Sequence, residues 1–415
     1  MHTMSHMRRE RPIAFDMFCG CGGISSGLRS ADFQIIAGAD IQPNYICTFK
    51  HNFPEAKAIT DDLSRVRPEE VMQWLNLIPG DLDLLAGGPP CQGFSKNVPR
   101  KSRYLDLPNN QLVKTFLQYV EVLKPKLVLM ENVAEMKNGF DSFYTQELLE
   151  RLSEVGYQVT YQVLNAADYG VPQRRRRAFF LATRLGSPLS FPLPTNAPIE
   201  KRGTQEIQLS MLGRVDAHHV SVWDAIGDLP SVEHTDERTI FDYSMDPFSE
   251  YQLRMRGDNA KVKNHRPRTL ALKQYERLAS IGPGQGLKDL PSNLRPKSGY
   301  SGAYGRLTKE MVAPTITRWV FHPGSGRFGH PTDIRVITIR EAARIQGFPD
   351  NFEFLGTYTQ QAGQVGNAVP PLLIQKIAEA MQSQQLSTLR EVDFRYSQGD
   401  LQTAPQKDAE LQSVA

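Results

Sequence analysis

The stretch Leu84-Leu85-Ala86-Gly87-Gly88-Pro89-Pro90-Cys91-Gln92-Gly93-Phe94-Ser95 runs from apolar residues into two glycines, two prolines and a cysteine. The apolar part predicts a buried strand over 82–86. Glycine opens unusual backbone angles, whereas proline fixes φ and removes a donor, so the turn should hold the thiol in one direction. A cysteine that only filled a core would lie inside the apolar run. The pattern therefore indicates a nucleophilic thiol in a loop that follows a strand.

Similar apolar runs alternate with helical patterns on both sides of this stretch. Strands are predicted over 13–18, 35–39, 82–86, 127–130, 159–164 and 178–182, with a further strand ending just before Asp61. Helices are predicted over 25–30, 44–51, 68–77, 111–123 and 143–155. This alternation predicts an α/β fold with a doubly wound, mostly parallel sheet covered on both faces. Ligands bind such sheets beyond the carboxyl ends of the strands, where the strand order switches.

The character of the sequence changes after Gly186. Prolines cluster over 188–198, and irregular sequence rich in Gly and Pro continues to about Gly329. We expect a second, smaller domain there without a doubly wound sheet of its own. Helices are predicted again over 338–346, where Thr338 and Glu341 form a capping-box pattern, and over 370–382.

Composition restricts the class of protein. The 415 residues are 40% hydrophobic, which is enough for a sizeable core, and no apolar run approaches the ~20 residues of a membrane span. Residues 1–11 are polar and basic, which is unlike a secretory signal and predicts a mobile arm. Four cysteines (Cys19, Cys21, Cys47 and Cys91) in a chain of this length favour a reducing compartment, hence a cytoplasmic protein. Cys19-x-Cys21 matches no common zinc spacing, so no metal site is expected.

The net charge of +3 is unevenly distributed. Residues 187–249 contain ten acidic and four basic side chains, whereas residues 250–306 contain twelve basic and four acidic ones. The basic stretch includes His265-Arg266-Pro267-Arg268. It is either a solvated surface or a face that contacts phosphates.

A glycine-rich loop, Asp16-Met17-Phe18-Cys19-Gly20-Cys21-Gly22-Gly23, follows the first predicted strand. Its spacing differs from the dinucleotide pattern, but its glycines would let the backbone approach a ligand closely. Asp40 ends the second strand, where an acid can hold ribose hydroxyls, and Asp61-Asp62-Leu63 follows the third. Two acids at successive strand ends beside this loop predict an adenosine-bearing ligand.

Further motifs follow at the ends of later elements. They are Glu131-Asn132-Val133, Gln173-Arg174-Arg175-Arg176-Arg177, Arg340-Glu341-Ala342-Ala343-Arg344-Ile345-Gln346-Gly347-Phe348-Pro349 and Gln364-Val365-Gly366-Asn367-Ala368-Val369-Pro370-Pro371. Together with the glycine loop and Pro-Pro-Cys-Gln, and in this order, they resemble the cytosine-5 DNA methyltransferases over roughly 13–381. The bacterial restriction-modification type is the nearest match. The resemblance implies the class I methyltransferase fold dependent on S-adenosylmethionine, with a target-recognition domain.

The resemblance also implies a chemistry. Cys91 would add as a thiolate to carbon-6 of a cytosine flipped out of the duplex, which makes carbon-5 reactive towards the methyl group of S-adenosylmethionine. Glu131 would hold the exocyclic amine and protonate ring nitrogen-3, a role that needs a raised pKa. Arg175 and Arg177 would steady the base and the catalytic loop. Arg174 and Arg176 are interpreted as structural charges.

By the same resemblance, the cofactor would contact residues from most of the strand ends. These are Phe18, Gly20, Gly23, Asp40, Ile41, Asp62, Leu63, Pro90, Leu112, Asn367, Ala368 and Val369. The sequence departs from the family pattern at the acid that ends the second strand. In the family this acid is usually Glu, followed by a bulky aromatic residue. Here it is Asp40 followed by Ile41, which leaves the affinity for the cofactor open.

Candidate DNA contacts fall in two regions. The loop 91–108 would close on the phosphate backbone as a mobile lid, with a passive charged loop as the alternative; its candidates are Gln92, Ser95, Lys96, Arg100, Lys101 and Arg103. The recognition region contributes Lys261, Lys263, Arg266 and Arg268.

The expected organisation is an arm over 1–11, a discontinuous catalytic domain over 12–185 and 362–385, a target-recognition domain over 186–361 and a flexible tail over 386–415. The expected partners are double-stranded DNA, bound by a monomer, and a cognate restriction or defence nuclease; no membrane is involved. Two alternatives stay open, namely the same chemistry on RNA, or a non-catalytic DNA-binding scaffold.

Overall fold

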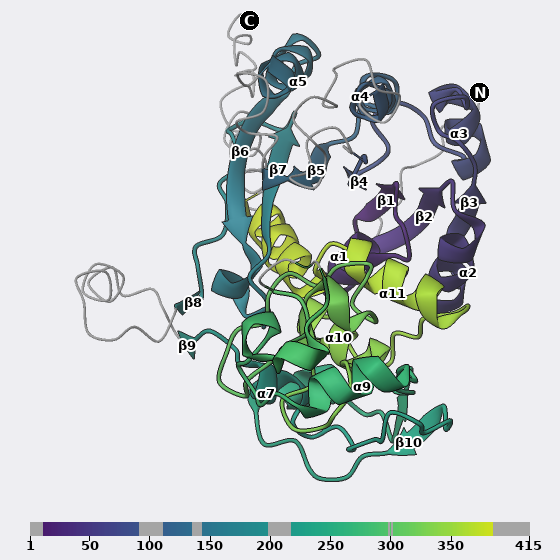
Figure 1. Ribbon diagram of the computed structural model, residues 1–415. Helices are drawn as coiled ribbons and strands as arrows, with labels where there is room; N and C mark the ends of the chain where they lie inside the picture. The colour runs from purple at the N-terminus through teal and green to yellow at the C-terminus, as the bar shows by residue number, and fades with distance from the viewer. Residues whose placement is uncertain are drawn as a thin grey trace, which may run out of the picture.

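A seven-stranded sheet dominates the computed structural model, which describes residues 11–90, 111–134, 143–197, 217–297, 299 and 302–384 (Figure 1). The sheet order is β3-β2-β1-β4-β5-β7-β6. Its strands are β1 (Ile13–Met17), β2 (Gln34–Asp40), β3 (Lys57–Thr60), β4 (Leu84–Gly87), β5 (Leu127–Val133), β6 (Gln158–Asn165) and β7 (Arg176–Thr183). Strands β1 to β5 are parallel to one another, and β7 is antiparallel to both β5 and β6.

Both faces of this sheet are buried. Leu84 and Ala86 of β4 join one hydrophobic cluster, whereas Leu85 between them joins another, because successive side chains of a strand point to opposite faces. The covering helices are α1 (Gly23–Ser30), α2 (Pro43–Asn52), α3 (Pro68–Leu75), α4 (Gln111–Leu123) and α5 (Phe143–Glu154). The doubly wound α/β fold and the predicted strands and helices up to Thr183 are therefore confirmed.

The region after β7 is built from short elements, drawn in green below the sheet in Figure 1. It contains the helices α7 (Val222–Ile226), α8 (Glu250–Arg256) and α9 (Leu272–Ala279), and 3-10 turns at Leu287–Asp289, Ser292–Leu294 and Pro323–Ser325. A further 3-10 turn, Ala166–Tyr169, lies between β6 and β7. Three two-stranded pairs accompany them: β8 (Asn196–Ala197) with β9 (Ala217–His218), β10 (Ile240–Asp242) with β11 (Lys261–Lys263), and β12 (Gly305–Arg306) with β13 (Arg327–Gly329).

The chain then returns to the sheet through α10 (Ile339–Gln346), α11 (Tyr358–Asn367) and a helix over 371–384. The predicted capping box of α10 is present, with Thr338 accepting from the Glu341 amide and Glu341 accepting from the Thr338 amide. One hydrophobic cluster contains Ile24 of α1, Ile226 of α7 and Phe348 after α10, so the two regions share a core. The division into catalytic and recognition domains stays a prediction.

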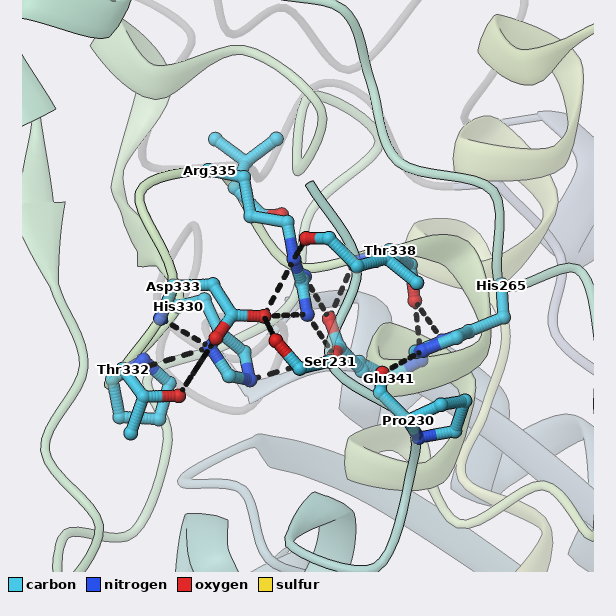
Figure 2. A network of polar contacts seen from close by, with 12 residues as sticks. Pro230, Ser231, His265, His330, Thr332, Asp333, Arg335, Thr338 and Glu341 are labelled. Atoms are coloured by element: carbon cyan, nitrogen blue, oxygen red, sulfur yellow. Dashed lines mark hydrogen bonds and ion pairs between the residues drawn. The ribbon is translucent and has the colours of Figure 1, made fainter. Parts of the chain in front are cut away.

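A buried polar network fixes the start of α10 against the preceding region (Figure 2). Arg335 donates to both carboxylate oxygens of Glu341 at 2.8 Å, and His330 lies 3.4 Å from the same carboxylate. His265 bridges the Thr338 hydroxyl at 3.0 Å and the Pro230 carbonyl at 2.7 Å. Because these groups come from three separate segments, around 230, around 265 and over 330–341, the network locks those segments together.

Among the described residues, no helix combines the length and the apolar character that crossing a bilayer requires. The arm over 1–10, the residues from 385 onwards and the loop 91–110, which contains Cys91, lie outside the described residues.

Candidate active site

The strand order brings the predicted motifs to one edge of the sheet. Parallel strands β1 to β5 all end there, and the order switches between β1 and β4, where a ligand crevice forms in such sheets. Antiparallel β7 begins at the same edge, since Arg177 pairs with Val133 at the end of β5. An arginine motif at the start of a strand therefore meets a glutamate at the end of its neighbour.

Glu131 lies near the carboxyl end of strand β5. Instead of following the strand, as the sequence predicts, Glu131 lies within β5, opposite Phe179. Glu131 is 9% exposed, and its Oε1 lies 3.0 Å from the Nε of Arg177. Burial raises the pKa of the Glu131 carboxyl, and the charges of Arg177 and Arg175 oppose that rise. The site thus holds a carboxyl that is easier to protonate than one in water.

Asn132 connects this carboxyl to the proline turn. Its side-chain amide donates to the Pro89 carbonyl at 3.1 Å, and its oxygen accepts from the Val133 amide at 2.8 Å. Glu131 also lies against the turn, because a Cβ on Gly88 would come within 3.2 Å of its Oε2. The residue that precedes Cys91 in the chain, Pro90, is exposed. The position of Cys91 itself is outside the described residues.

Arg175 and Gln173 join the sheet to the returning segments. Arg175 is 3% exposed and donates to the carbonyls of Ile316 at 3.1 Å and Gly366 at 3.3 Å. Burial, and then the charge of Arg177, lower the pKa of Arg175. Its Nε has no hydrogen-bond partner among the described residues. Gln173 accepts from the Ile316 amide at 2.7 Å, so Ile316 is held by both side chains.

The predicted cofactor loop has an unusual backbone. Phe18 has a φ of 56°, a left-handed conformation that costs a non-glycine residue about 1–3 kcal/mol and is concentrated at functional sites. The Asp40 carboxylate accepts from the Gly20 amide at 3.0 Å and from the Gln42 amide at 2.8 Å. Burial raises the pKa of Asp40. The acid that ends β2 therefore fixes the glycine loop.

The returning segment closes over this loop. A Cβ on Gly23 would lie 2.6 Å from the Val369 carbonyl, so the close approach of the two segments requires glycine. Asn367 donates to the Tyr45 hydroxyl at 2.9 Å, and Gln346 donates to the Ala368 carbonyl. Three of the predicted cofactor residues, Asn367, Ala368 and Val369, thus lie beside the first loop.

The remaining predicted cofactor residues lie at the neighbouring strand ends. Asp62 accepts from the Ser64 amide and hydroxyl, and Leu63 beside it is buried. Ile41 is 57% exposed, which leaves an apolar surface next to Asp40. Leu112 is half-buried in the first turn of α4.

Asp16 is a buried carboxyl that the sequence reasoning did not single out as a candidate. It is fully buried, it accepts from the Ser25 amide at 3.0 Å and hydroxyl at 2.6 Å, and its Oδ1 has no partner among the described residues. Burial raises its pKa to about 7. Its place immediately before the glycine loop was the available signal. Burial also raises the pKa of Cys19 and of Cys21, so neither thiol is suited to act as a thiolate.

The predicted DNA contacts of the basic stretch differ in their surroundings. Lys261 pairs with Asp242, and Lys263 pairs with Glu353 at 2.8 Å, so carboxylates already neutralise both. Arg266 and Arg268 line a cavity of about 800 Å³. The candidates Gln92, Ser95, Lys96, Arg100, Lys101 and Arg103 lie outside the described residues, as does the lid that they were expected to form.

The family model described as C-5 cytosine-specific DNA methylase matches residues 14–383. The chain belongs to this family. This DNA cytosine-5 methyltransferase is 34% identical over 394 residues to the type II methyltransferase M.XorII of Xanthomonas oryzae pv. oryzae, an alignment that covers 92% of this chain and 86% of that protein. It is 32% identical over 369 residues to the type II methyltransferase M1.HphI of Haemophilus parahaemolyticus, covering 88% and 85% of the two chains.

The methyltransferase also shares its fold with a solved structure, described as a DNA modification methyltransferase encoded within an E. coli prophage. The TM-score is 0.68 at 24% identity, over 90% of this chain and 99% of the other. Family membership makes the reaction a methylation that depends on S-adenosylmethionine.

Proposed function

We propose that this methyltransferase modifies one short sequence in duplex DNA, with Cys91 as nucleophile and Glu131 as the acid that activates the cytosine. The observation that carries the proposal is the buried Glu131 carboxyl of raised pKa, which lies against the turn leading to Cys91. A carboxyl that can be neutral is able to donate a proton to ring nitrogen-3. Without that protonation, addition of a thiolate at carbon-6 would place a negative charge on the ring.

In this proposal the arginines orient Glu131 and the flipped base and supply positive charge next to them. Arg177 holds the Glu131 carboxylate at 3.0 Å, which fixes its orientation towards the crevice. Arg175 ties the sheet to Ile316 and Gly366, and its Nε, which has no partner in the part of the chain that the structure describes, would be a donor for the flipped base. Asn132 fixes the Pro89 carbonyl, so the root of the Cys91 loop is set by the same strand that carries Glu131.

The residues at the other strand ends suit S-adenosylmethionine. When bound, S-adenosylmethionine supplies a methyl group activated by a sulfonium. Asp40 would hold the ribose hydroxyls, Asp62 the adenine amine, and the exposed Ile41 would pack on the adenine face. Asp16 Oδ1 has no partner among the residues that the structure describes, and a cationic amine would complete its hydrogen bonding.

The type II relatives support a modification role in which methylation protects DNA from a partner nuclease. A monomer suffices for this chemistry, because one chain supplies all the proposed residues. The proposed domain division is a catalytic part over 12–185 and 362–385 and a recognition part over 186–361.

The test is bisulfite sequencing of DNA from a methylation-free host that expresses the chain, beside a Cys91→Ala control. We expect protected cytosines at one short sequence, absent in the control. Complete conversion in both samples, with the protein present and folded, would overturn the proposal and favour RNA as substrate.

A further inference from the structure

A row of cations and aromatic rings leads away from the catalytic site. The Arg318 guanidinium lies 5.2 Å from the Trp319 ring centroid, the Trp319 and Phe321 rings are 5.9 Å apart, and Arg268 lies 5.1 Å from Phe321. Arg266 precedes Arg268 by two residues in the sequence, and both line the cavity of about 800 Å³. We call these five residues the arginine–aromatic strip.

One end of the strip is attached to the wall of the catalytic site. Ile316 is held by Gln173 and Arg175, and a Cβ on Gly366 would meet the backbone of Thr317 and of Arg318 at 2.2 Å. The Cα of Trp319 can therefore lie no more than roughly 11 Å from that of Ile316, since three extended residues span no more. The Arg318 charge also acts on Tyr45, where it opposes the rise in pKa that burial causes.

Trp319 is exposed although its backbone is fixed. The side chain is 51% exposed, whereas Val320 is fully buried and Phe321 is 8% exposed. The Trp319 carbonyl accepts from the His322 amide at 2.9 Å and from the Ser325 hydroxyl. A single exposed aromatic residue is common on protein surfaces, so exposure alone decides nothing. An exposed ring on a fixed backbone, beside a guanidinium and a second ring, is suited to contact a ligand.

At the other end of the strip, the residue that precedes Arg266 is fixed by hydrogen bonds. The buried His265, which precedes Arg266, is fixed by the Thr338 hydroxyl and the Pro230 carbonyl (Figure 2). Arg266 is exposed. Arg268 lies over Phe321 and within 6.0 Å of the Tyr358 ring centroid. The Arg268 guanidinium is therefore held at the cavity with little freedom to lose on binding, whereas Arg266 lines the cavity as an exposed residue.

We propose that the arginine–aromatic strip is the duplex-contacting surface that selects the target, with Trp319 and Arg318 against base edges next to the flipped cytosine and Arg266 and Arg268 on backbone phosphates. The inference rests on the proposed function and names the residues of this chain that recognise its substrate. Guanidiniums bind phosphates and guanine edges, and a ring near the flipped base can contact its neighbours. Phosphate contacts position the duplex, whereas base contacts distinguish sequences.

Substitutions at the two ends of the strip should affect DNA binding differently. The duplex for the test carries the sequence that bisulfite sequencing identifies, and a scrambled duplex serves for comparison. We expect Trp319→Ala to weaken binding to the target duplex at least tenfold while binding to the scrambled duplex is unchanged. We expect the double change Arg266→Gln and Arg268→Gln to weaken both complexes alike, and to reduce the slope of log affinity against log salt by roughly 0.9 for each lost phosphate contact.

Matched controls come from the opposite margin of the sheet. Trp74 in α3 is 39% exposed beneath Lys57, whose Nζ is 5.9 Å from the ring centroid, and Arg67 precedes the same helix. Trp74→Ala and Arg67→Gln remove the same groups and should leave affinity, specificity and salt slope unchanged. Calorimetric binding of S-adenosylmethionine shows that each variant is folded.

The outcomes separate the strip from the proposed function. Suppose that the wild-type chain methylates duplex DNA, but Trp319→Ala and the double arginine variant match it in affinity and salt slope. The proposed role of the strip is then refuted, whereas the proposed function stands. If the wild-type chain leaves duplex DNA unmethylated, the proposed function fails. The salt-slope comparison on the scrambled duplex still decides the arginine end, because it needs no methylation.

Discussion

Glu131 and Glu341 are both buried and both face arginine, yet their surroundings move the pKa of the two carboxyls in opposite directions. Burial raises the pKa of Glu131, whereas Arg335 and His330 overcome burial and lower the pKa of Glu341. Glu341 has two Arg335 contacts at 2.8 Å and the Thr338 amide at 2.7 Å. Among the described residues, Glu131 forms an ion pair with Arg177 Nε at 3.0 Å. The two carboxylates differ in the hydrogen-bond and ion-pair partners that the described residues provide to each.

The comparison separates a structural network from a reactive one. The Glu341 network, together with Arg344 between Asp228 and Asp350, joins α10 to the region before it. Fully satisfied buried networks rigidify a fold. At the proposed catalytic site, the Arg175 Nε lacks a partner among the described residues. Such groups are available to a substrate.

The largest effect should come from Glu131→Gln. The amide keeps the shape of the side chain but cannot deliver a proton, so the methylation rate should fall by roughly 10²- to 10⁴-fold. The free energy of unfolding at neutral pH should equal or exceed that of the wild type, because a buried charge is removed. Single-turnover methylation and urea unfolding measure the two quantities. A variant that methylates normally would remove Glu131 from the mechanism.

Glu341→Gln should show the reverse pattern. Removing one partner leaves Arg335 buried without its countercharge, which costs about 3–5 kcal/mol of unfolding free energy. Arg67→Gln, at an exposed pair with Glu70, is the control and should cost less than about 1 kcal/mol. Urea unfolding at neutral pH compares them. Equal losses in the two variants would contradict the structural role of the network.

The stabilising effect of Glu341 should also depend on pH. Because folding lowers its pKa below the ordinary value of 4.5, its contribution is present above about 4.5 and is lost as pH falls further. The difference in unfolding free energy between wild type and Glu341→Gln should therefore shrink on acidification. A difference that stays constant from pH 7 to pH 3 would show that the charge of Glu341 contributes nothing.

The smallest effect is expected at the cofactor loop. Asp40→Ala removes a carboxylate that holds the Gly20 amide and that would bind ribose, so the dissociation constant for S-adenosylmethionine should rise at least tenfold, about 1.4 kcal/mol. Isothermal titration calorimetry measures it. Ser64→Ala, which removes the hydroxyl partner of Asp62, is a milder control at the next strand end. Unchanged affinity in Asp40→Ala would refute its assignment.

The local patterns explain why much of this site could be predicted. Strand ends, glycine loops and the capping box of α10 depend on neighbouring residues, so the positions of Asp40, Glu131 and Arg177 follow from the sequence. Contacts between distant segments left no such pattern. The bond between Asn367 and Tyr45, which lie 322 residues apart, depends on how the returning chain packs, and the sequence reasoning did not find it. The sequence reasoning also did not single out the buried Asp16 or the contact between the neighbouring residues Arg318 and Trp319, because burial and side-chain direction are not written in a local pattern.

The most direct test of the account is the pH dependence of methyl transfer in single turnovers, with DNA and S-adenosylmethionine saturating. The raised pKa of Glu131 predicts a rate that declines towards alkaline pH as this carboxyl loses its proton, and a residual rate in Glu131→Gln that lacks this decline. A wild-type rate that only rises with pH, in parallel with that of Glu131→Gln, would contradict the account.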